Sequence, residues 1–281
     1  MSAREGISDP ALLALAERLL ADTGFDIRQY KERPLKRRLA VRLRACKAAS
    51  YLGYIELLQR DPSEYPKLWD ALTINVTNFY RNPETYAAVQ EKVFPLLVAE
   101  AKGAGSLLFW SAGCSSGEEP YSLAILWREF CRQHPTGLAV RIVATDIDAE
   151  SLRKAKAGLY THTSFNEIPA DLWGKYFKPE GENFRIDPAI QSLVQFQRAE
   201  LMEPAPFHGV DMVSCRNALI YFSREAQETV FDHFVASLRP GGFLVLGKVE
   251  TLLGQTKERF VNFDIKERIY RLSARQPANH G

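Results

Sequence analysis

Four short apolar runs, separated by segments of helical character, constrain the fold of this chain more than any other feature of its sequence. The runs cover residues 107–111, 140–145, 210–214 and 243–246. Buried strands that alternate with helices predict a doubly wound, mostly parallel α/β sheet with helices on both faces. Such sheets bind ligands beyond the carboxyl ends of their strands. We therefore expect the chemistry at residues 112–119, at Asp146, and at Arg216 and Asn217.

Residues 1–70 predict a separate helical domain ahead of this sheet. Asp9 and Pro10 have the residue types of a helix cap and a first helical position. A second helix is expected over residues 34–47, where one face carries Leu35, Leu39, Leu43 and Cys46. We expect a linker at 71–90, the larger domain at 91–275 and a tail at 276–281. The strand–helix alternation breaks over residues 160–198, where short strands at 184–186 and 193–197 predict a small inserted antiparallel β-subdomain.

The net charge of +2 conceals an uneven distribution of charge. Residues 28–47 contain nine lysines and arginines and one acid, Glu32, so this segment carries +8 and the rest of the chain −6. Such a concentration argues for an acidic partner at one place, and not for a protein that is basic overall. The simpler alternative is a solvated basic helix face.

Composition and spacing exclude several classes of protein. The chain contains no run of 18 apolar residues, so no transmembrane helix is expected. Its four cysteines are scattered without a C-x-x-C pair, which predicts a reducing, cytoplasmic location and no disulfide framework. Its five histidines have no metal-ligand spacing, so we expect no metal.

The loop at residues 111–120 favours a cationic cofactor. It contains Gly113 and Gly117 but does not match the G-x-G-x-x-G pattern of dinucleotide sites. Glu118 and Glu119, at the start of the following helix, would repel a pyrophosphate there. S-adenosylmethionine fits better, because it carries a sulfonium and an ammonium and no phosphate, and Asp146 can accept from its ribose hydroxyls. The alternative is that the two acids only favour a helix N-terminus.

Several segments in this order resemble one known family. They read TINVTNFYR, WSAGCSSGEEPYSLA, VATDID, SCRNALIYFS and LRPGGFLVLGKVE. Together they are similar to the chemotaxis receptor methyltransferase family (CheR), over nearly the whole chain. The resemblance implies transfer of a methyl group from S-adenosylmethionine to glutamate side chains on receptor signalling helices. It also implies a helical N-terminal domain, a linker and a doubly wound domain with an inserted β-subdomain.

The resemblance assigns roles to individual residues. It implies that the cofactor is bound by Asn75, Thr77, Arg81, Glu118, Glu119, Asp146, Glu200, Leu201, Arg216 and Asn217. Either Glu118 or Glu119 would hold the methionine amino group, and the sequence leaves both open. Glu200 stands where the family commonly has Asn, so its side-chain contact is open too. The resemblance implies catalytic roles for Arg81 and Tyr221, with Tyr221 close to the transferred methyl group.

The chemistry is consistent with these residues. A glutamate substrate has an unperturbed pKa of about 4.3 and is ionised at neutral pH, so no general base is required. Arg81 can orient the substrate carboxylate through a paired hydrogen bond. The alternatives are a surface ion pair for Arg81 and a packing role for Tyr221.

The basic segment supplies a predicted docking surface for an acidic receptor helix. Its candidate residues are Arg37, Arg38, Arg42 and Arg44. In part of the family that this chain resembles, the inserted β-subdomain binds a short peptide at the C-terminus of the receptor. The loop here is shorter, so we expect activity that is independent of such a receptor C-terminal pentapeptide. We also expect a monomer. Two other functions remain open: methylation of another acidic substrate or of a nucleic acid, and a non-catalytic role as a cofactor-binding adaptor.

Overall fold

A computed structural model describes residues 7–72, 77–101, 103 and 105–274 of the chain. Its contacts divide the chain into two units, which we describe separately. The N-terminal unit comprises Met1–Asn75 and Ile220–Gln227, and the sheet unit comprises Val76–Leu219 and Glu228–Gly281. Asn75, one of the expected cofactor-binding residues, lies outside the described residues.

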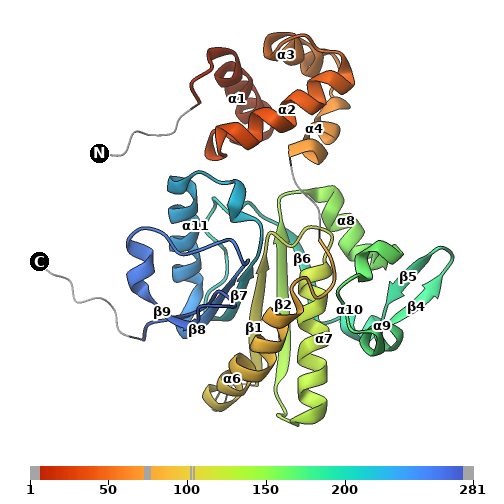
Figure 1. The fold of residues 1–281 in the computed structure, drawn as a ribbon, viewed down its shortest axis with the longest axis vertical. Coiled ribbons are helices and arrows are strands. Elements are labelled where there is room, and N and C mark those ends of the chain that lie inside the picture. Colours follow the sequence, from red (N-terminus) through yellow and green to blue (C-terminus); the bar gives the residue numbers. More distant parts are fainter. Residues whose placement is uncertain (1–6, 73–76, 102, 104, 275–281) are drawn as a thin grey trace, which may run out of the picture. The chain divides into compact units, whose positions relative to one another are not determined.

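The described part of the N-terminal unit is helical (Figure 1) and includes α1 (Pro10–Thr23), α2 (Glu32–Cys46), α3 (Tyr51–Arg60) and α4 (Glu64–Leu72). The Asp9 carboxylate caps α1 by accepting from the N–H groups of Ala11 and Leu12, as its sequence predicts. The predicted helix over residues 34–47 begins two residues earlier, at Glu32. The unit encloses its own apolar core, which includes Leu12, Leu15, Leu19, Leu39, Tyr54, Leu58 and Leu68.

The sheet unit contains the predicted mostly parallel sheet, with seven strands in the order β6-β2-β1-β7-β8-β10-β9. β1 (Ser106–Ala112) lies centrally and pairs in parallel with β2 (Ala139–Asp146) and β7 (Val210–Cys215). β8 (Leu238–Leu246) extends the parallel set beside β7. The antiparallel strands β9 (Phe260–Asp264) and β10 (Ile269–Leu272) complete that edge.

Helices cover both faces of this sheet. Adjacent residues of a strand point to opposite faces. The Phe109 ring lies 5.9 Å from that of Trp127 on α7 (Glu118–Gln133). Trp110, the next residue, lies 5.2 Å from Phe234 on α11 (Arg224–Ser237). Phe94, on α6 (Phe94–Glu100), packs on the same face as Phe109. The doubly wound arrangement expected from the sequence is therefore confirmed.

The inserted β-subdomain is smaller than predicted. It holds β3 (Leu159–Tyr160), β4 (Phe177–Glu180) and β5 (Asn183–Ile186) in an antiparallel sheet, with the helix α9 (Ala170–Tyr176). The strand predicted at 193–197 belongs to the main sheet, because β6 (Val194–Arg198) pairs in parallel with β2. Phe196 packs 5.4 Å from Tyr121 of α7, and the short helix α10 (Pro188–Gln191) returns the chain to the sheet edge.

One further strand is longer than predicted. The residues 239–242, expected to precede a strand, lie inside β8, which begins at Leu238. The pairing register between β7 and β8 shifts between Val210 and Met212. Such an irregularity frees a strand position from ladder bonding, which accommodates a proline such as Pro240.

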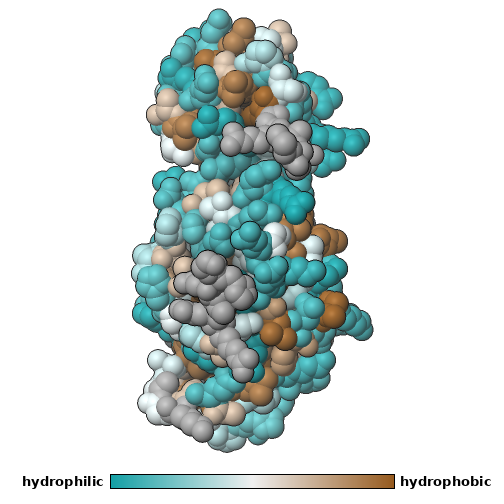
Figure 2. Space-filling model, turned by 90° about the vertical axis from the view of Figure 1, so that its left-hand side faces the viewer, coloured by the Kyte–Doolittle hydropathy of each residue, from teal (hydrophilic) through white to brown (hydrophobic). Residues whose placement is uncertain are grey.

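The surface has no broad apolar face in the view of Figure 2, which is mostly hydrophilic with scattered hydrophobic side chains. The exposed large hydrophobic residues include Val41 and Leu52 in the N-terminal unit and Val249 in the sheet unit. Within the described ranges, no helix combines the length and the apolar character that crossing a membrane requires.

Candidate functional site

The loop after β1 forms a tight, closely packed turn at the carboxyl edge of the sheet. The N–H groups of Gly113 and Cys114 donate to the Thr145 carbonyl at 2.8 and 2.9 Å, which joins this loop to the end of β2. Gly117 has a φ of 95°, and a Cβ there would lie 2.9 Å from the Cβ of Ala155. A glycine is therefore required where the loop turns into α7.

Asp146 connects the loops that follow the first two strands. Its carboxylate accepts the N–H of Ser115 at 2.7 Å and that of Asp148 at 2.9 Å. Burial raises the pKa of Asp146 above its usual range, and these backbone donors oppose that rise. A partly buried carboxylate at this edge has the chemistry to accept further hydrogen bonds from a ligand.

The two adjacent acids of the loop differ in their surroundings. Glu118 is buried and accepts from the hydroxyls of Ser116 at 2.8 Å and Ser164 at 3.5 Å. Burial raises the pKa of Glu118 to about 7, and no cation pairs with it among the described residues. Glu119 accepts from the Ser111 hydroxyl at 2.7 Å. Burial raises the pKa of Glu119 as well, while the guanidinium of Arg216 opposes that rise.

Arg216 anchors the linker segment that carries Arg81. Its Nη2 donates to the Arg81 carbonyl at 2.5 Å and to Asn82 Oδ1 at 3.1 Å. Its guanidinium carbon lies 5.1 Å from the ring centroid of Tyr86, so the buried charge is covered by an aromatic face. Arg81 itself stands between two residues with left-handed backbone, Tyr80 (φ 54°) and Asn82 (φ 57°).

Glu250 organises the loop after β7, a role that the sequence reasoning missed. Its carboxylate accepts N–H groups from Asn217 and Leu219 at 2.8 Å and from Gly247 at 2.7 Å. Glu250 ends the KVE segment that contributed to the resemblance, and this was the available signal. The neighbouring Val249 is 74% exposed.

Leu201 lies beside the first loop, and Glu200 precedes it in the chain. Leu201 Cδ1 is 3.9 Å from the position that a Cβ on Gly113 would take, and the Leu201 carbonyl lies 3.1 Å from a ring nitrogen of His233. Glu200 is half-buried, and its carbonyl accepts the N–H of Glu203 at 3.1 Å. Thr77, the other expected linker contact, is half-buried.

Comparison with known proteins identifies the family of this chain. Residues 10–73 match the family model "CheR methyltransferase, all-alpha domain", and residues 75–269 match "CheR methyltransferase, SAM binding domain". The chain belongs to the CheR family.

Relatives in several bacteria support the assignment to the CheR family. A chemotaxis protein methyltransferase of Listeria monocytogenes is 33% identical over 83% of this chain and 86% of its own length. Chemotaxis protein methyltransferase 1 of Pseudomonas aeruginosa is 38% identical over 65% of this chain and 68% of its own length. A 104.1 kDa protein of Rhodobacter capsulatus is 33% identical over 92% of this chain, which spans 27% of that protein.

One match among the solved structures is PKMT2 from Rickettsia typhi in complex with AdoHcy. Its sequence identity to this CheR-family chain is 14%, and its TM-score is 0.36. The match covers 62% of this chain and 26% of that one.

S-adenosylmethionine, the cofactor of the CheR family, fits the residues present. Glu118 is a buried carboxylate without a cationic partner among the described residues, and Asp146 is a second acceptor at the same sheet edge. The Oδ1 atom of Asn217 is buried and has no hydrogen-bond partner in the described part of the chain. Carboxylates and a vacant amide acceptor suit a ligand that carries an ammonium, a sulfonium and hydroxyl groups.

Tyr221 and the expected docking arginines belong to the N-terminal unit of this CheR-family chain. Arg38 is buried, donates to the Leu72 carbonyl and lies 4.1 Å above the ring centroid of Tyr221. Burial lowers the pKa of Arg38 below its usual range. Arg38 therefore faces the interior, which differs from the expectation that it contacts an acidic partner.

Arg42 also has an internal partner. It forms a two-fold hydrogen-bonded pair with the carboxylate of Glu64, which additionally accepts from the Tyr54 hydroxyl at 3.0 Å. The two remaining candidates, Arg37 and Arg44, are exposed. Both Arg38 and Arg42 flank the apolar stripe of α2, and this border position explains why they turn inward.

Proposed function

We propose that this protein transfers the methyl group of S-adenosylmethionine to glutamate side chains of chemoreceptor signalling helices, giving methyl esters. Membership of the CheR family supports this proposal, as do relatives that are named chemotaxis protein methyltransferases. A chemotaxis role, a cytoplasmic location and a monomeric enzyme are parts of the same proposal.

The exposed arginines of α2 are the observation that favours an acidic helical substrate in this proposal. Arg33, Arg37 and Arg44 are exposed on one 15-residue helix, α2, and Lys47 is exposed directly after it. Opposite charge steers an acidic partner to such a surface and fixes its orientation. The docking surface is accordingly Arg33, Arg37, Arg44 and Lys47, with Arg37 and Arg44 as its named test positions.

The residues of the chain act mainly by positioning. When bound, S-adenosylmethionine supplies an electrophilic methyl group. Glu118 is the better candidate of the two acids to hold a cationic amino group, because Arg216 already acts on Glu119. Asp146 would accept from ribose hydroxyls, and Leu201, Arg216 and Asn217 would line the pocket.

Substrate orientation would come from Arg81 and Tyr221. The substrate carboxylate is ionised at neutral pH, so the enzyme need only orient and desolvate it. Arg81 would orient the substrate carboxylate, and Tyr221 keeps the role that the family resemblance implies, close to the transferred methyl group. Tight pairing with Arg81 would reduce the nucleophilicity of the substrate carboxylate. Orientation of that carboxylate is therefore the larger contribution of Arg81 to the rate.

The compact insertion supports independence from a receptor pentapeptide. The strands β4 and β5 are joined directly through Gly181 and Glu182, which leaves a short connection between them. Binding of a receptor C-terminal pentapeptide in calorimetry would contradict this part of the proposal.

The main test uses labelled S-adenosylmethionine and receptor-containing membranes. We expect base-labile label on the receptor, the mark of an ester, and its loss with Tyr221→Phe. Parallel incubations with RNA and DNA test the nucleic-acid alternative, which predicts label there instead. Intact signalling by the Tyr221→Phe variant in cells would favour the adaptor alternative.

A further inference from the structure

The backbone that presents Arg81 is held in a disfavoured conformation. Tyr80 and Asn82 both have φ values near 55°, a region that L side chains rarely adopt. Such residues persist only where the surrounding structure fixes them, and they cluster at functional sites. The contacts that fix this segment therefore determine where the Arg81 side chain points.

Three parts of the sheet unit hold the segment. The Tyr80 N–H donates to Ser122 Oγ on α7 at 2.9 Å. The Asn82 N–H donates to Glu167 Oε2 in the insertion at 2.8 Å. Arg216, after β7, donates to the Arg81 carbonyl at 2.5 Å. These contacts define the kink but leave the following helix, α5 (Pro83–Ala88), to be fixed separately.

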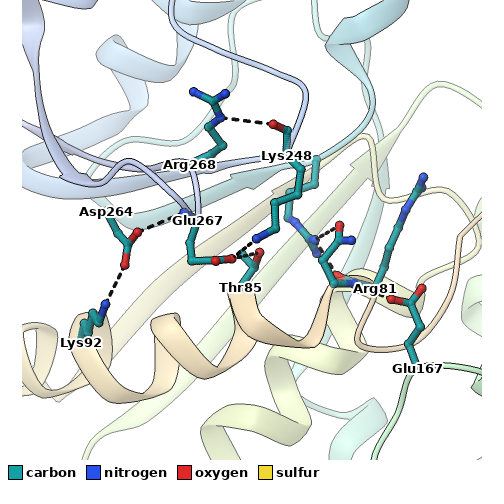
Figure 3. A network of polar contacts seen from close by, with 10 residues as sticks. Arg81, Thr85, Lys92, Glu167, Lys248, Asp264, Glu267 and Arg268 are labelled. Carbon is teal, nitrogen blue, oxygen red and sulfur yellow. Dashed lines mark hydrogen bonds and ion pairs between the residues drawn. The ribbon is translucent and has the colours of Figure 1, made fainter.

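Glu267 holds that helix through Thr85. Thr85, one helical turn after Arg81, donates its hydroxyl to Glu267 Oε2 at 2.8 Å. Thr85 is 2% exposed and Glu267 is 4% exposed. Glu267 lies in the turn between β9 and β10, where its own N–H donates to Asp264 Oδ1 at 3.0 Å. Figure 3 shows the Glu267 carboxylate between Thr85 and Lys248.

Lys248 extends this connection to the loop after β8. Its ammonium pairs with the same Glu267 carboxylate, and its carbonyl accepts from Arg268 Nε at 3.2 Å. Two residues after Lys248, the Glu250 carboxylate accepts the backbone N–H groups of Asn217 and Leu219. Glu267 thus contacts both the linker helix and the loop whose glutamate orients Asn217.

The pairing with Lys248 favours the charged form of the buried Glu267 carboxylate. Burial alone would raise the pKa of Glu267, but the Lys248 ammonium and the Thr85 hydroxyl hold it below its usual range. An ionised acceptor makes stronger hydrogen bonds than a neutral one. The Thr85 contact is therefore a strong, directional one.

We propose that Glu267 is a positioning residue for Arg81, acting through Thr85 and supported by Lys248. It sets the start of α5, and with it the place of Arg81 relative to Asn217 in the cofactor pocket. This inference rests on the proposed role of Arg81 at the cofactor, and no part of it requires a receptor substrate.

Calorimetric binding of S-adenosylhomocysteine to the full chain tests the inference. We expect Thr85→Val to weaken binding about tenfold, since a bond to a charged group is lost. Glu267→Gln should also weaken binding of S-adenosylhomocysteine. Thr85→Ser, which keeps the hydroxyl, should bind with the affinity of the wild type. Lys92→Met is the matched control, because it removes an exposed pair with Asp264 on the same turn and leaves Thr85 and Lys248 untouched.

A double-mutant cycle distinguishes positioning from general stability. If Thr85 acts through Arg81, Thr85→Val should weaken binding by less than about twofold in an Arg81→Ala background. Equal losses in both backgrounds would overturn the inference, as would unchanged affinity for Thr85→Val and Glu267→Gln. A wild-type protein that binds S-adenosylhomocysteine but forms no receptor ester would refute the proposed function and leave this inference standing.

Discussion

The guanidinium carbon of Arg38 lies 4.1 Å from the ring centroid of Tyr221. Arg38 is nearly covered, whereas its neighbour Arg37 is exposed. A desolvated cation over a tyrosine face contributes about 2 kcal/mol. Adjacent arginines on α2 are thus suited to different tasks: Arg38 orients Tyr221 inside the N-terminal unit, and Arg37 faces solvent.

Substitution of these neighbours should separate the two tasks. Arg38→Met should lower kcat for receptor methylation severalfold and should also lower Tm, because the cation over the Tyr221 ring and the bond to the Leu72 carbonyl are both lost. Arg37→Ala should raise KM and reduce its salt dependence while leaving kcat unchanged. Steady-state kinetics at low and high salt, with thermal unfolding, measure all of these quantities. A raised KM with unchanged kcat for Arg38→Met would contradict the assignment.

The pair between Arg42 and Glu64 should stabilise the N-terminal unit. Glu64→Gln leaves Arg42 and Tyr54 without their charged acceptor and should cost about 3 kcal/mol of unfolding free energy. Arg42 holds the pKa of Glu64 below its usual range. This stabilisation is therefore present above the ordinary glutamate pKa and is lost as pH falls through the folded value.

Lys67→Ala is the control for this prediction. Lys67 lies 3.6 Å from the same carboxylate but is 53% exposed, so its removal should cost less than about 0.5 kcal/mol. Urea unfolding at pH 7 and pH 3.5 measures both variants. Similar losses of unfolding free energy for Glu64→Gln and Lys67→Ala would contradict the prediction that the pair with Arg42 is the main stabilising contact of Glu64.

The sequence predicted those parts of the molecule that depend on local pattern. The strand runs and the capped first helix were predicted correctly because hydrophobic period and cap chemistry are properties of neighbouring residues. The placement of β6 in the main sheet was not predicted. Its partner β2 lies about fifty residues earlier in the chain, and both the main sheet and the small antiparallel sheet can bury a short apolar run. Pairing partners are set by tertiary packing.

The missed site residues share a different cause. Glu250 and Glu267 act on groups far away in the chain, and Glu250 does so by accepting backbone N–H groups, which every non-proline residue carries. Local hydrophobic or capping patterns do not mark such an acceptor, and for Glu250 the available signal was its place at the end of the KVE segment. Likewise, helical spacing placed Arg38 and Arg42 at the border of the apolar stripe, and only the positions of Tyr221 and Glu64 turned them inward.

Gly247 should tolerate no side chain. A Cβ at this position would lie 2.7 Å from Glu250 Oε2 and 2.9 Å from the backbone nitrogen of Asn217. Gly247→Ala should therefore cost about 2 kcal/mol and weaken S-adenosylhomocysteine binding, because the Asn217 loop must shift. Gly174→Ala, in α9 with nothing within 4 Å, should leave Tm unchanged or slightly higher. Comparable stability of the two variants would be inconsistent with the packing described here.

Glu118 should make both stability and cofactor binding depend on pH. Burial raises its pKa from 4.5 to about 7, so the folded protein binds this proton more tightly than the unfolded chain does. The unfolding free energy of the ligand-free protein should then fall by about 3 kcal/mol as pH rises from 4.5 through 7. Glu118→Gln should remove that dependence and stabilise the ligand-free protein at pH 7.5.

Cofactor affinity should change in the opposite direction. A cationic amino group binds the ionised carboxylate, whose population rises roughly eightfold between pH 6 and pH 7.5 when the pKa is 7. Affinity for S-adenosylmethionine should rise by about that factor, over a range in which most of the ligand's own α-amino group is still protonated. Calorimetry at the two pH values measures it, and Glu118→Gln should bind weakly with a flat profile. If Glu119→Gln gave the flat profile instead, Glu119 and not Glu118 would hold the amino group.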